Sequence, residues 1–446
     1  MKRLTPILLA LLIPIIAYAQ FAGEWQGKLS MGQTELALVF KFVQTDSVIT
    51  GTLDVPQQGA KNLPIDKIKL NGNKIALTIS AIGFDYNGTL NEGDMPTIEG
   101  EMRQNGYTFP LTLKPNIKVN RPQTPKSPFP YFQEEVVVVN AKDGNKLTGT
   151  LVKPLMMNEN TPVAVLVSGS GQQNRDEELM EHKPFWVIAD YLARNGIATL
   201  RYDDRGVGGS DALGLATATT ETFKGDALAM VNYLKENGMK NIGVIGHSEG
   251  GLIAFMLGAE VEELDFVISL AGTAVSGDQI LIEQNRMLLE KSEVPTEIVN
   301  SYCELLKEIY AIKRSGAQFD RESKITELRN KYSYLPLQMI GNIAALLQPQ
   351  AWIDYFISYD PTEALKNIGC RVLALNGDKD VQVIAKQNID ALKQHILAEQ
   401  LTTKIYPDLN HLFQHCTTGM PNEYYQIEET ISPEVLKDII NWIKKQ

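Results

Sequence analysis

NIGVIGHSEGGLIAFML, residues 241–257, combines a buried β-strand, a glycine-rich turn and an apolar helix. The strand is predicted over Asn241–Ile245 and the helix from about Gly250. Between them, GHSEG at 246–250 fits the pattern G-x-S-x-G, which places a serine on a sharp strand-to-helix turn. The glycines leave room for that turn, and the start of the helix favours negative charge beside the serine. The pattern therefore predicts Ser248 as a nucleophile.

The alternation of strand and helix continues on both sides of this stretch. Strands are predicted at Glu135–Asn140, Leu147–Val152, Val163–Val167, Ile197–Tyr202, Phe266–Leu270, Arg371–Leu375 and Thr403–Tyr406, and helices at about Pro184–Asn195 and Phe223–Asn237. Continuous apolar strands separated by helices indicate a mostly parallel sheet that is covered on both faces. Active sites in such sheets lie at the carboxyl ends of the strands, so we expect the partners of Ser248 there.

A serine hydroxyl is a poor nucleophile unless a base accepts its proton. The chain has five histidines, and His411 is the best candidate because it follows the strand at 403–406 after a short loop. His415 is the reserve candidate. The acid that orients the imidazole should follow the strand at 371–375, where Asp378 and Asp380 both qualify.

Two backbone amides are expected to stabilise the oxyanion that forms during attack. The first is the N–H of Glu249, the residue after the nucleophile. The second should come from the glycine-containing loop after the strand at 163–167, where glycines let the backbone approach a substrate oxygen. The Ser170 amide is the predicted donor, with Gly171 beside it, and a plain tight turn is the alternative interpretation.

These motifs resemble the α/β-hydrolase superfamily over roughly Phe132 to Gln446. More narrowly, they resemble secreted bacterial carboxylesterases related to prolyl oligopeptidase, dienelactone hydrolase and cinnamoyl-ester esterases. The segments that carry the resemblance are SGSGQQNRDE (168–177), DRGVGGS (204–210), GDKD (377–380) and LNHLFQ (409–414). The first has a serine where many members have histidine. The resemblance implies ester hydrolysis through a Ser-His-Asp triad without metal or organic cofactor, and its G-x-x-D spacing favours Asp380 over Asp378.

A helical cap is expected at about 273–365, because the connection between the strands at 266–270 and 371–375 is far longer than usual. Helical patterns occur at Asp278–Lys291, Thr296–Ser315, Arg321–Lys331 and about Leu335–Leu347. An aromatic cluster that includes Trp352 and Phe356 follows them. These aromatics, with Gly171, are candidates for substrate binding, and the alternative is that they pack the cap onto the sheet.

A small all-β domain is predicted at 20–115, where apolar residues recur with period 2. Short runs such as Val48–Val55, Ile65–Leu70 and Thr97–Arg103 favour an antiparallel meander or open barrel. Five prolines between 115 and 130 predict an extended linker at 116–131. The hydrolase domain then occupies 132–446.

The first nineteen residues have the pattern of a secretory signal peptide. Met1-Lys2-Arg3 is basic, Ile7 to Ile16 is largely apolar, and Ala17-Tyr18-Ala19 is an A-x-A cleavage site. The apolar run is too short to span a bilayer, which takes about 20 residues. We therefore expect an exported chain, periplasmic or extracellular, without stable insertion in the membrane.

Composition limits the partners. The formal net charge of −11, from 42 Lys and Arg against 53 Asp and Glu, argues against nucleic acid. Three widely spaced cysteines form neither a disulfide framework nor a metal pattern. The expected substrate is a small-molecule or glycan-linked ester, and nothing predicts an oligomeric state. Alternatives are a serine peptidase, an acyltransferase or thioesterase with the same triad, and a glycan- or lipid-binding protein with a relic hydrolase domain.

Overall fold

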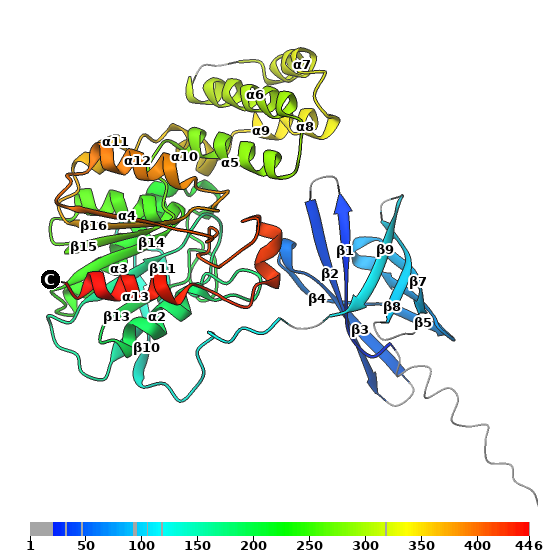
Figure 1. The fold of residues 1–446 in the computed structure, drawn as a ribbon, viewed down its shortest axis with the longest axis horizontal. Helices are drawn as coiled ribbons and strands as arrows, with labels where there is room; N and C mark the ends of the chain where they lie inside the picture. The colour runs from blue at the N-terminus through cyan, green and yellow to red at the C-terminus, as the bar shows by residue number, and fades with distance from the viewer. Residues whose placement is uncertain are drawn as a thin grey trace, which may run out of the picture. The chain divides into compact units, whose positions relative to one another are not determined.

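The computed structural model describes residues 21–31, 34–45, 48–91, 96–104, 106–116, 119–316 and 319–445. The predicted signal peptide at 1–19 lies outside the described residues. The chain divides into two units, one ending at Val119 and one starting at Asn120 (Figure 1). In the described part of the chain, no helix combines the length and apolar character needed to cross a bilayer.

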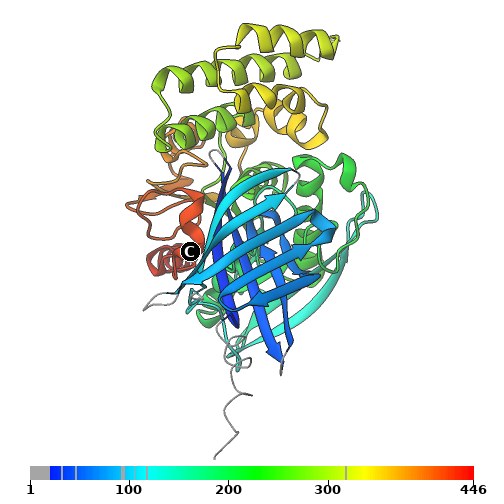
Figure 2. The ribbon, with the colours of Figure 1, turned by 90° about the vertical axis from the view of Figure 1, so that its right-hand side faces the viewer.

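The N-terminal unit is a nine-stranded antiparallel sheet (Figure 2). Its strands are β1 (Gly23–Met31), β2 (Thr34–Thr45), β3 (Val48–Val55), β4 (Ala60–Pro64), β5 (Lys67–Asn71), β6 (Lys74–Ile79), β7 (Phe84–Asn91), β8 (Thr97–Gln104) and β9 (Tyr107–Pro115), in the order β4-β3-β2-β1-β9-β8-β7-β6-β5. The predicted run Ile65–Leu70 is wrong in its start, because the chain leaves one edge of the sheet after Pro64 and enters the other edge at Lys67.

This sheet curls on itself around a core of side chains. The rings of Phe40 on β2 and Tyr86 on β7 lie 6.1 Å apart, although β1, β9 and β8 separate their strands in the sheet. In a flat sheet, with about 4.8 Å between neighbouring strands, they would be roughly 19 Å apart. Tyr86 Oη donates to the carbonyl oxygens of Ile98 and Leu111, at 2.9 and 3.1 Å. Aromatic and aliphatic side chains therefore fill the inside of the curled sheet.

The second unit contains an eight-stranded sheet in the order β10-β11-β13-β12-β14-β15-β16-β17. The strands are β10 (Tyr131–Val139), β11 (Lys146–Pro154), β12 (Val163–Val167), β13 (Ala198–Tyr202), β14 (Ile242–His247), β15 (Phe266–Leu270), β16 (Arg371–Gly377) and β17 (Leu401–Tyr406). The pairs β10–β11 and β11–β13 are antiparallel, and the remaining neighbours are parallel. Strands β12 to β17 therefore direct their carboxyl ends to one edge.

Helices cover both faces of this sheet. They are needed because successive residues of the buried strands point to opposite faces and are apolar on both. Val163 and Val165 of β12 belong to the core that packs against α3 (Thr220–Glu236), α4 (Glu249–Glu260) and α12 (Ala385–His395). Ala164 and Leu166 belong to the opposite core, with α2 (Pro184–Arg194) and α13 (Pro433–Ile443). A strand with no polar face is stable only in such a three-layer arrangement.

A helical insertion separates β15 from β16. It consists of α5 (Gly277–Lys291), α6 (Thr296–Arg314), α7 (Arg321–Lys331), α8 (Leu337–Gly341), α9 (Ile343–Leu346), α10 (Ala351–Ser358) and α11 (Thr362–Lys366) (Figure 1). Helices α5 to α9 share a hydrophobic core of their own. The single helix predicted at 335–347 is two short helices, because Gly341-Asn342 interrupts it.

The proline-rich segment that starts the second unit is bound to it. The Arg121 guanidinium donates to the carbonyl oxygens of Tyr425, Ile427 and Met180, at 2.7, 2.9 and 3.1 Å. The Gln123 side-chain amide donates to one backbone carbonyl and accepts from one backbone amide of the segment before α13. The segment is not simply extended, because the Thr124 amide donates to the Arg121 carbonyl oxygen at 3.1 Å and closes a turn. From Asn120 onward it lies along the α/β unit.

Candidate active site

Ser248 lies between β14 and α4, at the carboxyl edge of the sheet. Its backbone has φ 55° and ψ −119°, a conformation that non-glycine residues rarely adopt. A Cβ on Gly246 would lie 1.9 Å from the carbonyl oxygen of Gly250, and one on Gly250 would lie 2.1 Å from that of Val167. The turn therefore needs glycine at both positions, and it leaves the serine partly exposed.

His411 and Asp380 meet in the loops that follow β17 and β16. His411 Nδ1 lies 2.7 Å from Asp380 Oδ2, and both side chains are buried. The other oxygen of Asp380 accepts hydrogen bonds from the amides of Gln382 and Val383, at 2.8 and 2.9 Å. The carboxylate is thus fixed by its own loop and aimed at the imidazole.

The competing candidates lie elsewhere. Asp378 accepts a hydrogen bond from the Asp408 amide at 2.7 Å and so joins the two loops. His415 is largely exposed, and its Nδ1 lies 2.8 Å from Glu429 Oε2. The side chains that meet are therefore those of His411 and Asp380.

His247, the residue before Ser248, brings the histidine loop to the turn. Its Nε2 lies 3.0 Å from the carbonyl oxygen of His411, and the two rings have centroids 4.6 Å apart. On the opposite ring side, His247 Nδ1 lies 2.9 Å from Glu177 Oε1. The contact between His247 and His411 therefore brings the His411–Asp380 pair next to the turn that carries Ser248.

The glycine-containing loop after β12 passes directly beside Ser248. A Cβ on Gly169 would lie 3.1 Å from the Cβ of Ser248. The Gly169 amide donates to Glu177 Oε1 at 2.8 Å, so the next amide, that of Ser170, is the nearer candidate for an oxyanion. Gly171 follows with φ 99°, in the region that favours glycine. The Glu249 amide belongs to the first residue of α4, directly after Ser248 in the chain.

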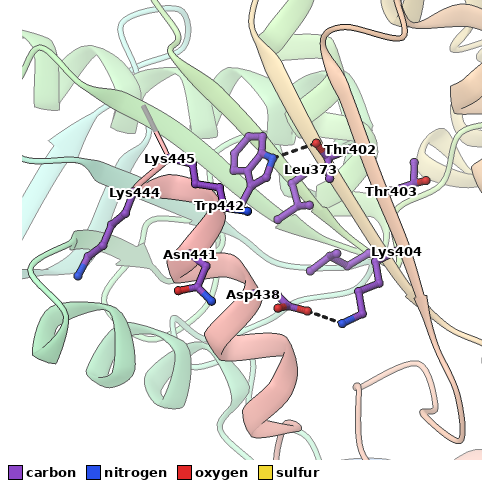
Figure 3. A pocket seen from close by; sticks show the side chains of 10 residues that line it. Leu373, Thr402, Thr403, Lys404, Asp438, Asn441, Trp442, Lys444 and Lys445 are labelled. Carbon is purple, nitrogen blue, oxygen red and sulfur yellow. Dashed lines mark hydrogen bonds and ion pairs between the residues drawn. The ribbon is translucent and has the colours of Figure 1, made fainter.

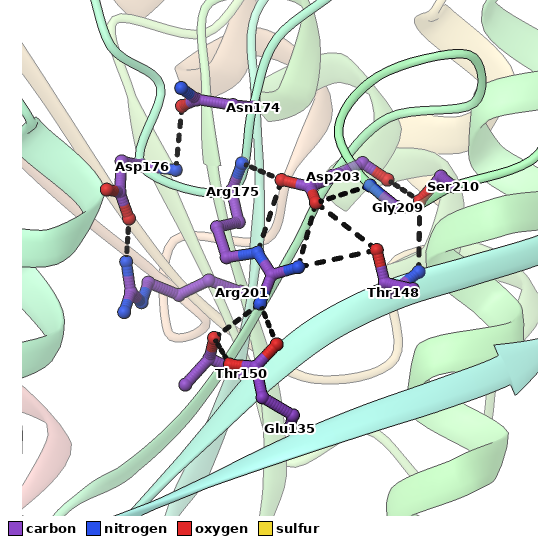
Figure 4. A network of polar contacts seen from close by, with 10 residues as sticks. All are labelled: Glu135, Thr148, Thr150, Asn174, Arg175, Asp176, Arg201, Asp203, Gly209 and Ser210. Carbon is purple, nitrogen blue, oxygen red and sulfur yellow. Dashed lines mark hydrogen bonds and ion pairs between the residues drawn. The ribbon is translucent and has the colours of Figure 1, made fainter.

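A network of charged residues holds this loop, as Figure 4 shows. The Arg175 guanidinium donates to both oxygens of Asp203, at 3.2 and 2.8 Å, and to Thr150 at 2.7 Å. Asp176 forms an ion pair with the buried Arg201. Sequence reasoning did not assign these residues. The available signal was the charged run 175–177, which begins four residues after the last glycine of the loop.

Asp204 lies behind the same loop. Burial raises the pKa of Asp204 to about 7, although the Gln173 amide and the Ser168 hydroxyl donate hydrogen bonds that favour its charged form. The nearby carboxylate of Glu177 adds to the rise. The predicted loop motif therefore has a buried acid at its base.

The sequence pattern of the serine aminopeptidase S33 family matches residues 183–415, slightly more than half of the chain. The chain belongs to this family of α/β hydrolases. The match contains Ser248, Asp380 and His411. The matched region begins after the glycine loop, so any role of Ser170 or Glu177 is inferred from the geometry and not from the family match.

Individual relatives of this hydrolase are distant. Esterase EstD of Thermotoga maritima is 24% identical over 350 residues, which cover 78% of this chain and 76% of the relative. An acyl transferase of Aliivibrio fischeri is 28% identical over 200 residues, 44% of this chain, and the hydrolase spans 62% of that relative. A solved esterase of Pyrococcus furiosus is 16% identical, with a TM-score of 0.43 over 74% of this chain and 98% of that one.

The cap of the hydrolase is joined, through a buried carboxyl group, to the turn that carries Ser248. Glu249 is 3% exposed and accepts hydrogen bonds from Thr220 Oγ1 at 2.6 Å and from Trp352 Nε1 at 2.8 Å. Burial raises the pKa of Glu249, against the effect of these two donors. Trp352 lies on α10, so a residue of the G-x-S-x-G motif contacts the cap directly.

Phe356, one turn after Trp352, has the contacts of a packing residue. It is 5% exposed and lies against Leu252 and Met256 of α4. Its ring stacks on that of Trp352, with centroids 5.3 Å apart and an angle of 10°. Of the two interpretations of the cap aromatics, these contacts correspond to packing of the cap on the sheet.

A groove of about 490 Å³ lies away from these residues, between β16, β17 and α13 (Figure 3). It is lined by Leu373, Leu375, Thr402, Thr403, Lys404, Asp438, Asn441, Trp442, Lys444 and Lys445. Lys404 pairs with Asp438 at 2.6 Å, and Trp442 Nε1 donates to Thr402 Oγ1 at 3.1 Å. Neither Ser248 nor His411 lines it, so we separate this groove from the candidate site.

Trp352→Phe should loosen the cap. The substitution keeps an aromatic ring but removes the indole N–H, which leaves the buried Glu249 carboxyl with one donor fewer. We expect a loss of about 1–3 kcal/mol in the free energy of unfolding and faster hydrogen–deuterium exchange in α10. Trp186→Phe is the matched control, because the partly buried Trp186 Nε1 has no hydrogen-bond partner among the described residues. Equal losses in the two variants would contradict the role of the Glu249 contact.

Proposed function

We propose that this hydrolase is a serine esterase that cleaves carboxylic esters through Ser248, His411 and Asp380. The observation that carries the proposal is the 2.7 Å contact between His411 Nδ1 and Asp380 Oδ2 beside a serine in strained backbone geometry. A buried carboxylate at Nδ1 selects the tautomer that leaves Nε2 free to accept a proton. The match to the esterase of Thermotoga maritima supports the ester as substrate.

The proposed reaction uses these groups in turn. His411 Nε2 accepts the proton of Ser248 Oγ as the oxygen attacks the ester carbonyl. Asp380 stabilises the imidazolium that forms, and the amides of Glu249 and Ser170 donate hydrogen bonds to the oxyanion. The imidazolium then gives its proton to the leaving alcohol, and a water molecule activated by His411 releases the acid and frees Ser248.

The substrate class follows from charge. The formal net charge of −11 disfavours strongly anionic substrates, so we propose neutral small-molecule or glycan-linked esters. No step of this reaction calls for a metal or an organic cofactor.

Ser248→Ala should lower kcat for a short aryl ester by at least about 10,000-fold, because no other group supplies the nucleophile.

Asp380→Asn should lower kcat by about 10,000-fold, as the same change of the triad acid does in other serine hydrolases. Asp378→Asn is its matched control and should stay within a few-fold of the wild type. Initial rates and labelling by a fluorophosphonate probe measure the effect. Full activity in Ser248→Ala, or no labelling of the wild type, would contradict the proposal and favour a binding protein with a relic site.

A second candidate, acyl transfer or peptide hydrolysis with the same triad, is favoured by the acyl transferase relatives and by the family's description. Acetyl, butyryl, feruloyl, thioester and aminoacyl-anilide substrates, each with and without an added alcohol, separate the possibilities. We expect ester hydrolysis to be fastest, with water as the main acceptor. Faster cleavage of the anilide, or a dominant transfer product, would replace esterase by one of these activities.

We also propose that the enzyme is exported, with cleavage after Ala19. The support is the order of basic, apolar and small residues at 1–19. Amino-terminal sequencing of the protein from a bacterial periplasm or culture medium should find Gln20 first. Retention of Met1 on the folded cellular protein would exclude cleavage.

A further inference from the structure

A second histidine–carboxylate pair lies directly behind the nucleophile. His247 and Glu177 are 7% and 5% exposed, and His247 Nδ1 lies 2.9 Å from Glu177 Oε1. On the other side of the ring, Nε2 lies 3.0 Å from the carbonyl oxygen of His411. Neither His247 nor Glu177 takes part in the reaction described above.

The partners of the two ring nitrogens limit the number of protons on the ring. A backbone carbonyl can only accept a hydrogen bond, so Nε2 must carry a proton. Glu177 Oε1 already accepts the Gly169 N–H at 2.8 Å, a contact that favours an ionised carboxylate. Opposite an ionised Glu177, Nδ1 must also donate, whereas a protonated Glu177 would donate to a neutral ring. A neutral imidazole has only one N–H, whereas the imidazolium ion has two.

His182 is the contrasting case in the same molecule. It is fully buried, with Nε2 2.9 Å from the carbonyl oxygen of Tyr424 and Nδ1 3.0 Å from the hydroxyl of Thr430. The Thr430 hydroxyl can donate to or accept from Nδ1, and the Gln414 amide, whose Nε2 also lies 3.0 Å from His182 Nε2, can donate there. Either neutral tautomer of His182, with one ring N–H, therefore finds partners on both sides. Burial lowers the pKa of His182 to about 4.

We propose that His247 is an imidazolium ion, paired with Glu177, which positions His411 and keeps it in its neutral, base-competent form. The proposal rests on the function assigned to His411 above. The positive ring holds the His411 backbone by a charge-assisted hydrogen bond. It also lies 4.6 Å, centroid to centroid, from the ring that must accept the serine proton. Like charges so close disfavour a proton on His411.

The surroundings of the pair preserve its charges. The titratable groups that face His247 are Glu177, His411 and Asp380. Burial alone would lower the pKa of His247, but the Glu177 carboxylate, the His411 carbonyl and Asp380 raise it. Asp204 lies beyond Glu177 and interacts with it. The remaining wall is apolar, from α2, β15 and the segments after β17: Pro184, Phe185, Ile188, Leu270, Leu412, Phe413 and Ile431.

Glu177 gives the pair a second task. The same oxygen that faces His247 accepts the amide hydrogen of Gly169, the residue before the proposed oxyanion donor Ser170. One carboxylate therefore connects the oxyanion loop, the nucleophile turn and the histidine loop. Loss of the charge and loss of the carboxyl group should have different effects on catalysis.

Ring-nitrogen NMR of the full chain tests the protonation directly. With uniformly ¹⁵N-labelled protein at pH 7, we expect two ring N–H signals for His247 and one for His182, with His247→Gln assigning the resonances. In Glu177→Gln, the amide can donate to Nδ1, so His247 should show one N–H. Two N–H groups on His247 support the proposal even if Ser248→Ala retains activity, whereas a single one in the wild type overturns it.

The pH profile of kcat/KM tests the effect on His411. His247→Gln removes the positive ring, so the acid limb should move to higher pH by roughly half a pH unit to one pH unit. Glu177→Gln, which removes both charges but keeps the hydrogen bonds, should move it in the same direction by less. A purely structural role would lower kcat and leave the limb in place, and that result would overturn the electrostatic part of the proposal.

Discussion

The turn between β14 and α4 has no room for a side chain on either glycine, and every group around Ser248 is placed relative to it. The Ser248 amide donates to the carbonyl oxygen of Leu270 on β15 at 3.0 Å, while Gly250 lies against the end of β12. The turn is therefore held from both sides by the centre of the sheet. A non-glycine residue in this conformation costs roughly 1–3 kcal/mol, and such strain persists only where the surroundings determine it. Because contacts with β12 and β15 determine the backbone of the turn, Ser248 stays at the carboxyl edge of the sheet.

Much of this arrangement can be predicted from sequence, because apolar strands with glycine-rich ends have few other ways to pack. The order of strands and helices from Val163 to Tyr406 follows from the length and period of the apolar runs. The choice between Asp378 and Asp380 is different. Both lie in one loop, so strand and helix periods do not separate them. The G-x-x-D spacing of the resemblance favours Asp380, and the path of the chain after β16 turns that carboxylate toward the imidazole.

The errors have physical causes as well. Ile65 and Asp66 cross between two edges of a curled sheet. They do not fit the period of β5, in which Ile68 and Leu70 are the inward positions, and a break of two residues is easily overlooked in a short apolar run. Gly341 reduces helix stability by about 1 kcal/mol relative to alanine, enough to divide a short amphipathic helix but too little to predict the break with certainty. Glu177 could not be assigned because its partner His247 is 70 residues away in sequence, while its contact with the nearby Gly169 goes to a backbone amide, which any residue type supplies.

Two buried carboxyl groups explain how these distant segments keep one geometry. Glu249 follows Ser248 in the chain, and Glu177 contacts His247, which precedes it. Removing a carboxylate from water costs several kcal/mol unless donors replace the water. The donors come from α3 and the cap for Glu249, and from the glycine loop and the nucleophile turn for Glu177. Displacing any of these segments would leave a buried acid with one donor fewer. The free-energy cost of that lost hydrogen bond opposes independent motion of the segments. The glycine loop, the turn at Ser248 and α10 are therefore held together by polar contacts as well as by the apolar cores.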